Sequence, residues 1–291
     1  ELRPTTYRIS LKGVETGSGE AFPDLVFAIE TADMMGRLKG EPGVDPLSGA
    51  PGIWIEAEER ERALMRGYRV IDANHVIARH IEAVYRAHAG ELLGRAEIQQ
   101  LLDSVNAATP GLVEEVTPHL LPLTSVQSIL QNLVTEGVSI RDIRSILEIL
   151  AARAGRTHDI DELTETVRAS LGRNIVDRLF EGAEALYVIG LAPEVENRLI
   201  AEMGEEGEAM VSPELVEALP FMAERAMARQ AAQGGALVLL VAPALRAPLA
   251  RMLRRTGLPV LSYAEIPANM SCKTRPGWRG GESRKRNARE F

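Results

Sequence analysis

Two stretches decide the fold: GELLGRAEIQQLLD at residues 90–103 and LTSVQSILQNLVTEGVSIRDIRSILEIL at residues 123–150. In both, apolar residues recur at i, i+3 and i+4, the spacing of one buried face of an α-helix. Gly137 is expected to end a helix in a left-handed backbone, and Ser139 to cap the next helix with Asp142 as its capping-box partner. We predict a compact helical subdomain at residues 93–172, to which the rest of the chain is attached.

The residues before this subdomain are predicted to form a mixed α+β region. The alternation of apolar and polar residues at 7–14 is typical of a half-buried strand, and Gly17-Ser18-Gly19 is expected to be a turn. A Gly- and Pro-rich segment at residues 40–52 is expected to be a loop. A long helix should follow Asp72 or Asn74, either of which can cap it. We therefore predict a first lobe at residues 1–23 and 73–92, with a second lobe, residues 24–72, inserted into it.

The residues after the helical subdomain are predicted to form an α/β subdomain at residues 173–270. Asp159 or Asp161 should cap a helix that reaches Leu179. The continuous apolar run at 236–242 is typical of a buried parallel strand, and a helix from Pro243 and a strand at 258–263 complete a βαβ unit. The fold class is thus a multi-subdomain α+β and α/β protein.

The charge is unevenly distributed along the chain. The 291 residues carry a net charge of −8, but residues 271–291 hold seven Lys and Arg against two Glu, a net +5 that leaves −13 for the rest. An acidic body argues against nucleic acid as the main partner, because such binding needs basic surfaces that neutralise phosphates. We expect the basic residues 271–291 to be a disordered tail.

Cysteine content and hydropathy limit the location of the protein. A single cysteine, Cys272, excludes an internal disulfide and fits a reducing compartment. No apolar run approaches the ~20 residues needed to span a bilayer, and the first residues lack the apolar core of a signal peptide. We expect the chain as given to be soluble.

Motifs of catalysis and cofactor binding are missing from the sequence. There is no GxxxxGK[ST], GxGxxG or HExxH motif and no paired-cysteine metal site, and His80 and His88 lack a third ligand nearby. An alternative is an enzyme that binds a small anion at the strand ends of the α/β subdomain. The turn after the apolar run reads APALRAP, however, without the glycines that surround a phosphate. We therefore predict no catalytic residue, no metal and no cofactor.

Six collinear segments carry a resemblance to a known family: YRISLKGVETGSGE, GEPGVDPLSGAPGIWIE, GYRVIDANHVIARHI, HAGELLGRAEIQQLLD, EGVSIRDIRSILEIL and GLPVLSYAEIP, spread over residues 4–268. Together they resemble the cytoplasmic domain of the FlhA/SctV (FHIPEP) family of type III secretion export-gate proteins. They are most like the flagellar members, and the virulence injectisome members are the alternative.

The resemblance implies a non-enzymatic protein of flagellar protein export. It implies partners: export chaperones with their substrates, the ATPase complex and an FlhB-type gate component. It also implies a nonameric homo-oligomeric ring at the cytoplasmic face of the bacterial inner membrane, with the full-length protein embedded in that membrane. The third subdomain of the family carries most ring contacts, and here Arg141 and Arg144 are the predicted interface residues.

The resemblance also places a chaperone-docking site on the second lobe and its border with the first. The family's aspartate of a DPAFG-like motif corresponds to Asp45, which we expect to be exposed, and its phenylalanine three residues later corresponds to Ser48. The threonine of an ATHL motif corresponds to Arg79, and a proline to Thr31. These departures predict a shallower and more polar dimple than the family's. The apolar dimple residues correspond to Ile29, Ala50, Ile71 and Val76.

Overall fold

A computed structural model of the chain describes residues 3–180, 185–203, 213–232 and 237–278. The chain divides into two compact units, Glu1–Leu92 and Leu93–Phe291. The finer division into four subdomains stays a prediction.

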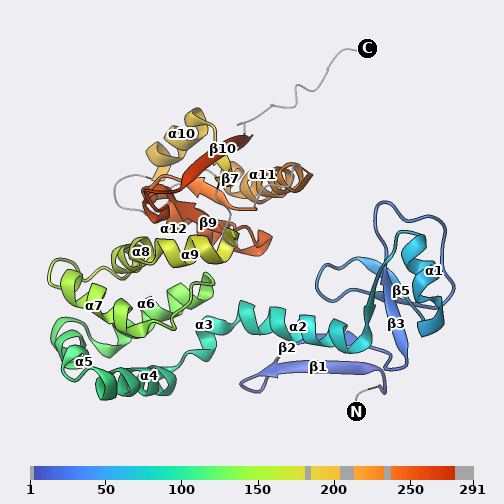
Figure 1. Cartoon of the computed structure of the whole chain (residues 1–291), viewed down its shortest axis with the longest axis horizontal. Helices are drawn as coiled ribbons and strands as arrows, with labels where there is room; N and C mark the ends of the chain where they lie inside the picture. Colours follow the sequence, from blue (N-terminus) through green and yellow to red (C-terminus); the bar gives the residue numbers. More distant parts are fainter. Residues whose placement is uncertain (1–2, 181–184, 204–212, 233–236, 279–291) are drawn as a thin grey trace. The chain divides into compact units, whose positions relative to one another are not determined.

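The first unit is built on a four-stranded antiparallel sheet in the order β4-β5-β3-β6. Helix α1 (Arg60–Met65) covers one face of this sheet and helix α2 (Ala73–Ala87) the other (Figure 1). Alternate residues of β3 therefore enter two different apolar cores, as expected for a strand buried on both faces. The strands are β3 (Leu25–Ile29), β4 (Glu41–Val44), β5 (Pro51–Glu56) and β6 (Arg69–Asp72).

A separate hairpin, β1 (Thr6–Leu11) and β2 (Val14–Glu20), corrects one sequence prediction. The turn lies at Lys12 and Gly13, which both have positive φ, and not at Gly17–Gly19. Gly17 and Gly19 lie inside β2, where they leave room for large side chains. A Cβ at Gly19 would lie 2.7 Å from the hydroxyl oxygen of Tyr7, and one at Gly17 would lie 3.0 Å from Nε2 of His80.

Strand β4 lies within the segment that was predicted to be a loop. Pro42 and Gly43 are poor strand formers, so the local sequence does not indicate a strand. Gly43 stands opposite Gly52 on β5, and both lie against the ring of Phe27. A Cβ at Gly52 would lie 2.5 Å from Cζ of Phe27. Tertiary packing on an aromatic ring thus selects the strand against its propensity.

The helices of the second unit share the predicted apolar core. Gly137 has φ +73° and follows α6, as predicted, but α7 is capped by Asp142, which accepts a hydrogen bond of 3.2 Å from Ser145 N. The prediction of Ser139 as the cap is therefore wrong. Asp159 caps α8, accepting from Glu162 N at 2.8 Å. The helices are α4 (Arg95–Ala108), α5 (Leu112–Glu114), η2 (Glu115–Leu120), α6 (Leu123–Thr135), α7 (Ile143–Ala154), α8 (Ile160–Ser170) and α9 (Gly172–Phe180).

The same unit contains a four-stranded parallel sheet in the order β10-β7-β8-β9. One face, with Val188 and Leu240, packs into the core formed by α4–α9. The other face, with Leu239 and Val241, packs on α10–α12. Figure 1 shows these layers. The elements are β7 (Ala185–Leu191), α10 (Pro193–Met203), α11 (Pro213–Ala232), β8 (Leu239–Val241), α12 (Pro243–Met252), β9 (Val260–Ser262), η4 (Tyr263–Glu265) and β10 (Ser271–Trp278).

Strand β10 contradicts the prediction of a disordered tail from residue 271. Ser271–Trp278 pairs in parallel with β7, with Ser271 opposite Ala185. The backbone hydrogen bonds of a sheet do not depend on the side chains, so a basic segment can form an edge strand without an apolar repeat. Residues 279–291 lie outside the described part of the chain.

The described residues offer neither a membrane-spanning helix nor a metal-binding cluster. None of the described helices is long and apolar enough to cross a bilayer. The described part of the chain also has no group of three or more His, Cys, Asp and Glu side chains placed to hold a metal ion.

Candidate docking site

The four apolar residues of the predicted dimple lie together in the first unit. Ile29 on β3 and Val76 on α2 belong to one apolar cluster, against which Ala50 and Ile71 pack. Ile29 and Val76 are only 2% and 1% exposed, whereas Ala50 and Ile71 are half-buried. A partner can therefore contact Ala50 and Ile71, while the other two residues support them from below.

Asp45 is buried, which contradicts the expectation of an exposed carboxylate. Its side chain is 1% exposed, and Ser48 Oγ donates to its Oδ2 at 2.6 Å. The 45–50 turn is closed by hydrogen bonds from Asp45 N to Ala50 O and from Gly49 N to Asp45 O, each 2.8 Å long. Asp45 Oδ1 has no hydrogen-bond partner among the described residues. The carboxylate thus lies underneath the turn.

The three departures from the family pattern lie in different surroundings. Ser48 is exposed at the tip of the turn, above Asp45. Arg79 is half-buried on α2, one helical turn beyond Val76 and so on a neighbouring part of the same face. Thr31 donates to the carbonyl of Gly67 at 2.6 Å, which ties the end of β3 to the turn before β6. Ser48 and Arg79 are accessible beside the dimple, and Thr31 has a structural contact.

Sequence reasoning missed Arg69, which the structure places at the same site. Arg69 stands opposite Ile29 in the β3–β6 ladder and two residues before Ile71, so the three share one face of the sheet. Its Nη2 lies 3.9 Å from Asp45 Oδ2, and its side chain is 55% exposed. Side chains two residues apart on a strand lie on the same face, so the position of Arg69 two residues before Ile71 could have indicated that it lies beside the dimple.

Tyr7 and His80 form a polar contact behind the turn. The Tyr7 hydroxyl lies 2.8 Å from Nδ1 of the buried His80, with their rings edge to face. Burial raises the pKa of Tyr7, and the charge of Asp45 raises it further. Asp45 and Tyr7 therefore interact electrostatically, although they belong to the second and the first lobe.

A hollow of about 460 Å³ lies between β2 and β4, beside the turn. Val44, 64% exposed, is on its wall, and Trp54 also lines it. Asp45 N donates to Ala50 O, across the hairpin of β4 and β5. Backbone hydrogen bonding alternates along an antiparallel strand, so the backbone groups of Gly43 also face β5, and those of Pro42 and Val44 face outward at the free edge of β4. Because Pro42 has no N–H, this edge supports addition of another strand poorly.

The sequence of the chain matches a family model described as the FHIPEP family over residues 1–271. The chain belongs to this family.

Relatives in the FHIPEP family include the flagellar biosynthesis protein FlhA of Escherichia coli K12, 43% identical over 271 residues. FlhA of Bacillus subtilis is 34% identical over 282 residues. These matches cover 92% and 94% of the chain but 39% and 41% of the relatives, so the chain spans about two fifths of their length.

Solved structures with the same fold include the Chlamydia pneumoniae CdsV protein, 26% identical, with a TM-score of 0.72 over 94% of this chain and 80% of that one. CdsV in complex with CdsO gives a TM-score of 0.77 at 26% identity, over 96% and 81% of the two chains. The nonameric SctV-C of EPEC is 24% identical, with a TM-score of 0.71 over 93% and 82%.

Within this FHIPEP chain, one predicted ring residue lies on α7 and the other just before it. Arg141 is exposed just before the N-cap of α7. Arg144 is exposed in the first turn of α7, outside its buried stripe, and its Nε lies 2.8 Å from Glu148 Oε1. The arrangement leaves both guanidinium groups accessible to a neighbouring molecule.

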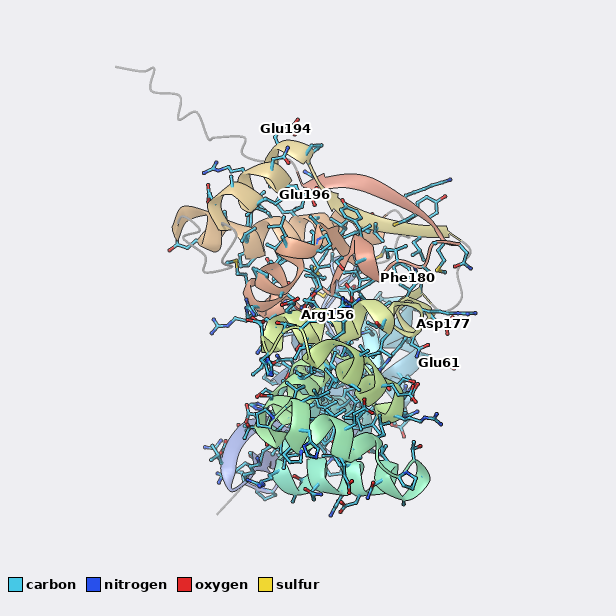
Figure 2. All side chains as sticks on the ribbon, turned by 90° about the vertical axis from the view of Figure 1, so that its left-hand side faces the viewer. Glu61, Arg156, Asp177, Phe180, Glu194 and Glu196 are labelled. Carbon is cyan, nitrogen blue, oxygen red and sulfur yellow. The ribbon has the colours of Figure 1, made fainter. Side chains whose placement is uncertain are left out.

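The N-terminus of α12 does not offer the anion site that the enzyme alternative requires. Glu196, labelled on α10 in Figure 2, accepts a hydrogen bond of 2.8 Å from Ala242 N, the N-cap residue of α12. Its charge also raises the pKa of Tyr263, after the larger effect of burial. A carboxylate already occupies the position where a helix would attract a phosphate, and it would repel a second anion.

A buried ion-pair network, also missed by sequence reasoning, joins the helical core to the α/β part of the second unit. Arg246 on α12 contacts Glu136 after α6 (2.6 Å) and Glu165 on α8. Arg168 on α8 pairs with Glu136 and with Glu265 of η4, both at 2.7 Å. Burial raises the pKa of Glu165, although Arg246 acts against this shift. The sequence does not show which charged residues of different helices pair with one another, so nothing there indicated this network.

Proposed function

We propose that this chain is the cytoplasmic part of a type III export-gate protein of the flagellar system. It docks export chaperones with their substrates on the surface around Ala50 and Ile71, and it assembles into a homo-oligomeric ring beneath the export channel. The observation that carries the proposal is that family dimple positions far apart in the sequence lie in one apolar cluster, under an accessible surface.

The flagellar assignment rests on sequence identity. Two flagellar biosynthesis proteins are 43% and 34% identical to the chain, whereas the CdsV structure is 26% identical. Injectisome export is the second candidate, because the neighbouring structures CdsV and SctV-C share the fold.

Assembly and further partners are supported by these neighbours. EPEC SctV-C is nonameric and CdsV forms a complex with CdsO, so this fold is used for both self-association and binding of other proteins. We extend to this chain a nonameric ring at the cytoplasmic face of the inner membrane, with Arg141 and Arg144 at the subunit interface. The ATPase complex and an FlhB-type gate component are the other expected partners.

The test is titration calorimetry with purified flagellar export chaperone–substrate complexes of the same organism. The parent chain should bind at least one complex. Ala50→Glu should weaken that binding at least tenfold, because it places a bulky charge on the accessible apolar surface. Ala57→Glu, an exposed position at the start of the η1 turn (Ala57–Glu59), is the matched control. Binding of injectisome chaperones alone would favour the second candidate, and binding of no complex would refute the proposal.

A further inference from the structure

We propose that the docking site reads a carboxylate of the chaperone, next to the chaperone's apolar anchor, through Arg69 and Arg79. Asp45 then acts from below as a positioning residue and does not contact the partner. This inference rests on the proposed function and names the chemistry of the segment that the site takes.

Arg69 lies beside the apolar residues of the dimple. It shares a sheet face with Ile29 and Ile71, and more than half of its side chain is exposed. A guanidinium there stands beside the apolar surface that the partner covers. Arginine offers a rigid fork of N–H donors that matches the two oxygens of a carboxylate.

Asp45 is too deeply buried to contact a partner. At 1% exposure it cannot accept a hydrogen bond from a docking partner without opening of the turn. Its Oδ2 accepts from Ser48, and it lies 3.9 Å from the guanidinium of Arg69. The carboxylate therefore holds the 45–50 turn and biases the position of Arg69. The polar groups that a partner meets are the Ser48 hydroxyl and the guanidinium groups of Arg69 and Arg79.

The acidic side chains around the site have other partners or lie elsewhere. On the strands and helix that form the site, Asp72 pairs with Arg60 and Glu82 pairs with Arg86. Glu30 follows Ile29 directly, so its side chain points to the opposite face of β3. Asp45 is the acidic group in contact with Arg69, whereas Glu41, exposed on the same sheet face, lies on β4 at the opposite edge of the sheet. We therefore assign Arg69 on β6 and Arg79 on α2 as the charged groups of the accessible site.

The occupant that fits this surface is a chaperone segment with Asp or Glu beside an aliphatic or aromatic side chain. The apolar side chain covers Ala50 and Ile71, and the carboxylate lies between Arg69 and Arg79. A basic or neutral segment would leave the two guanidinium groups unpaired at the interface, at a cost in affinity.

The experiment compares Arg69→Gln, Arg79→Gln and Arg69→Lys with the parent in titrations against the flagellar chaperone–substrate complexes. Each Gln variant should bind about tenfold more weakly, because each loses one charge-assisted contact. Arg69→Lys keeps the charge and should bind more tightly than Arg69→Gln. The affinity of the parent chain for the complex should fall as the NaCl concentration is raised. Arg86→Gln is the matched control, since Arg86 lies on the same helix α2 and pairs with Glu82.

A charge swap identifies the partner group. Chaperone variants in which the contacting Asp or Glu is changed to Lys should bind the parent chain weakly. One of these chaperone variants should regain affinity for the chain that carries Arg69→Glu. If Arg69→Gln and Arg79→Gln fold normally and bind as tightly as the parent, the inference is wrong. If Arg69→Gln lowers the thermal transition temperature, the affinities of Arg79→Gln and Arg69→Lys test the inference in its place. If the parent itself binds no complex, the proposed function fails instead.

Discussion

At the scale of single residues, Asp45 shows how burial changes the role expected of a side chain. The family motif places the proposed site on the 45–50 turn, but the sequence does not reveal which side of the turn the carboxylate faces. The side chain lies inward, where Ser48 donates to it. A substitution at Asp45 therefore acts first on the turn and only then on docking.

For Asp45 we predict opposite effects of two substitutions. Asp45→Ala should lower the free energy of unfolding by about 1–3 kcal/mol, because the Ser48 hydroxyl loses its acceptor. Asp45→Asn should be as stable as the parent or more stable, since the amide oxygen still accepts from Ser48 and no buried charge remains. Urea unfolding of both variants checks this, and equal destabilisation by Ala and Asn would contradict it.

The cap of helix α7 gives a second prediction at this scale, with a pH dependence. Asp142→Ala should lower the free energy of unfolding by about 1 kcal/mol, whereas Ser139→Ala should change it by less than about 0.5 kcal/mol. Hydrogen bonding by Ser145 lowers the pKa of Asp142 in the folded state. The contribution of Asp142 is therefore fully present above its unfolded pKa near 4 and lost as the pH falls through the lower folded value. Unfolding curves at pH 7 and pH 3 test this, and a larger loss for Ser139→Ala would contradict it.

At the scale of elements, the sequence predicted well those helices and strands whose own residues carry the period. The helical stretches at 90–103 and 123–150 correspond to α4, α6 and α7, and the predicted strand at 258–263 corresponds to β9. Strands β4 and β10 were missed, because Pro42 and Gly43 oppose a strand locally and Ser271–Trp278 has no apolar repeat. Both are edge strands whose position comes from a neighbouring strand of the sheet.

The buried ion pairs between α12 and the helical core carry the element-scale prediction. Arg246→Ala should lower the free energy of unfolding by about 3–5 kcal/mol, because Glu165 loses its cation and Glu136 keeps only Arg168 in a largely buried network. Arg251→Ala is the control on the same helix, since Arg251 forms an exposed pair with Asp161 worth about 0–1 kcal/mol. Thermal and urea unfolding measure both variants. Similar small losses for the two would show that the network does not stabilise the unit.

At the scale of the whole molecule, the fold class and the boundary near residue 92 were within reach of the sequence. What it did not reveal is that the helical and α/β parts of the second unit share one core. Leu186 and Leu261 of the parallel sheet pack into the same cluster as Ile146 and Leu150 of α7. A residue pattern shows which face of an element is apolar, but not which other element covers it.

Ring assembly is the prediction that belongs to this scale. The double variant Arg141→Glu, Arg144→Glu should lower the oligomer content in sedimentation velocity, because it reverses both exposed charges of the proposed interface. The thermal transition should stay nearly unchanged, since an exposed ion pair such as Arg144–Glu148 contributes only about 0–1 kcal/mol. Unaltered oligomers would remove these two residues from the interface.

The central claim is that chaperone–substrate complexes dock on the first unit at the dimple. Hydrogen–deuterium exchange of the chain, alone and with a flagellar chaperone–substrate complex that binds it, tests this most directly. We expect slower exchange of the amides in residues 45–50 and 69–79, where the partner covers the turn, β6 and the start of α2. Unchanged exchange there, with protection confined to α10–α12 or to the helical core, would contradict the claim.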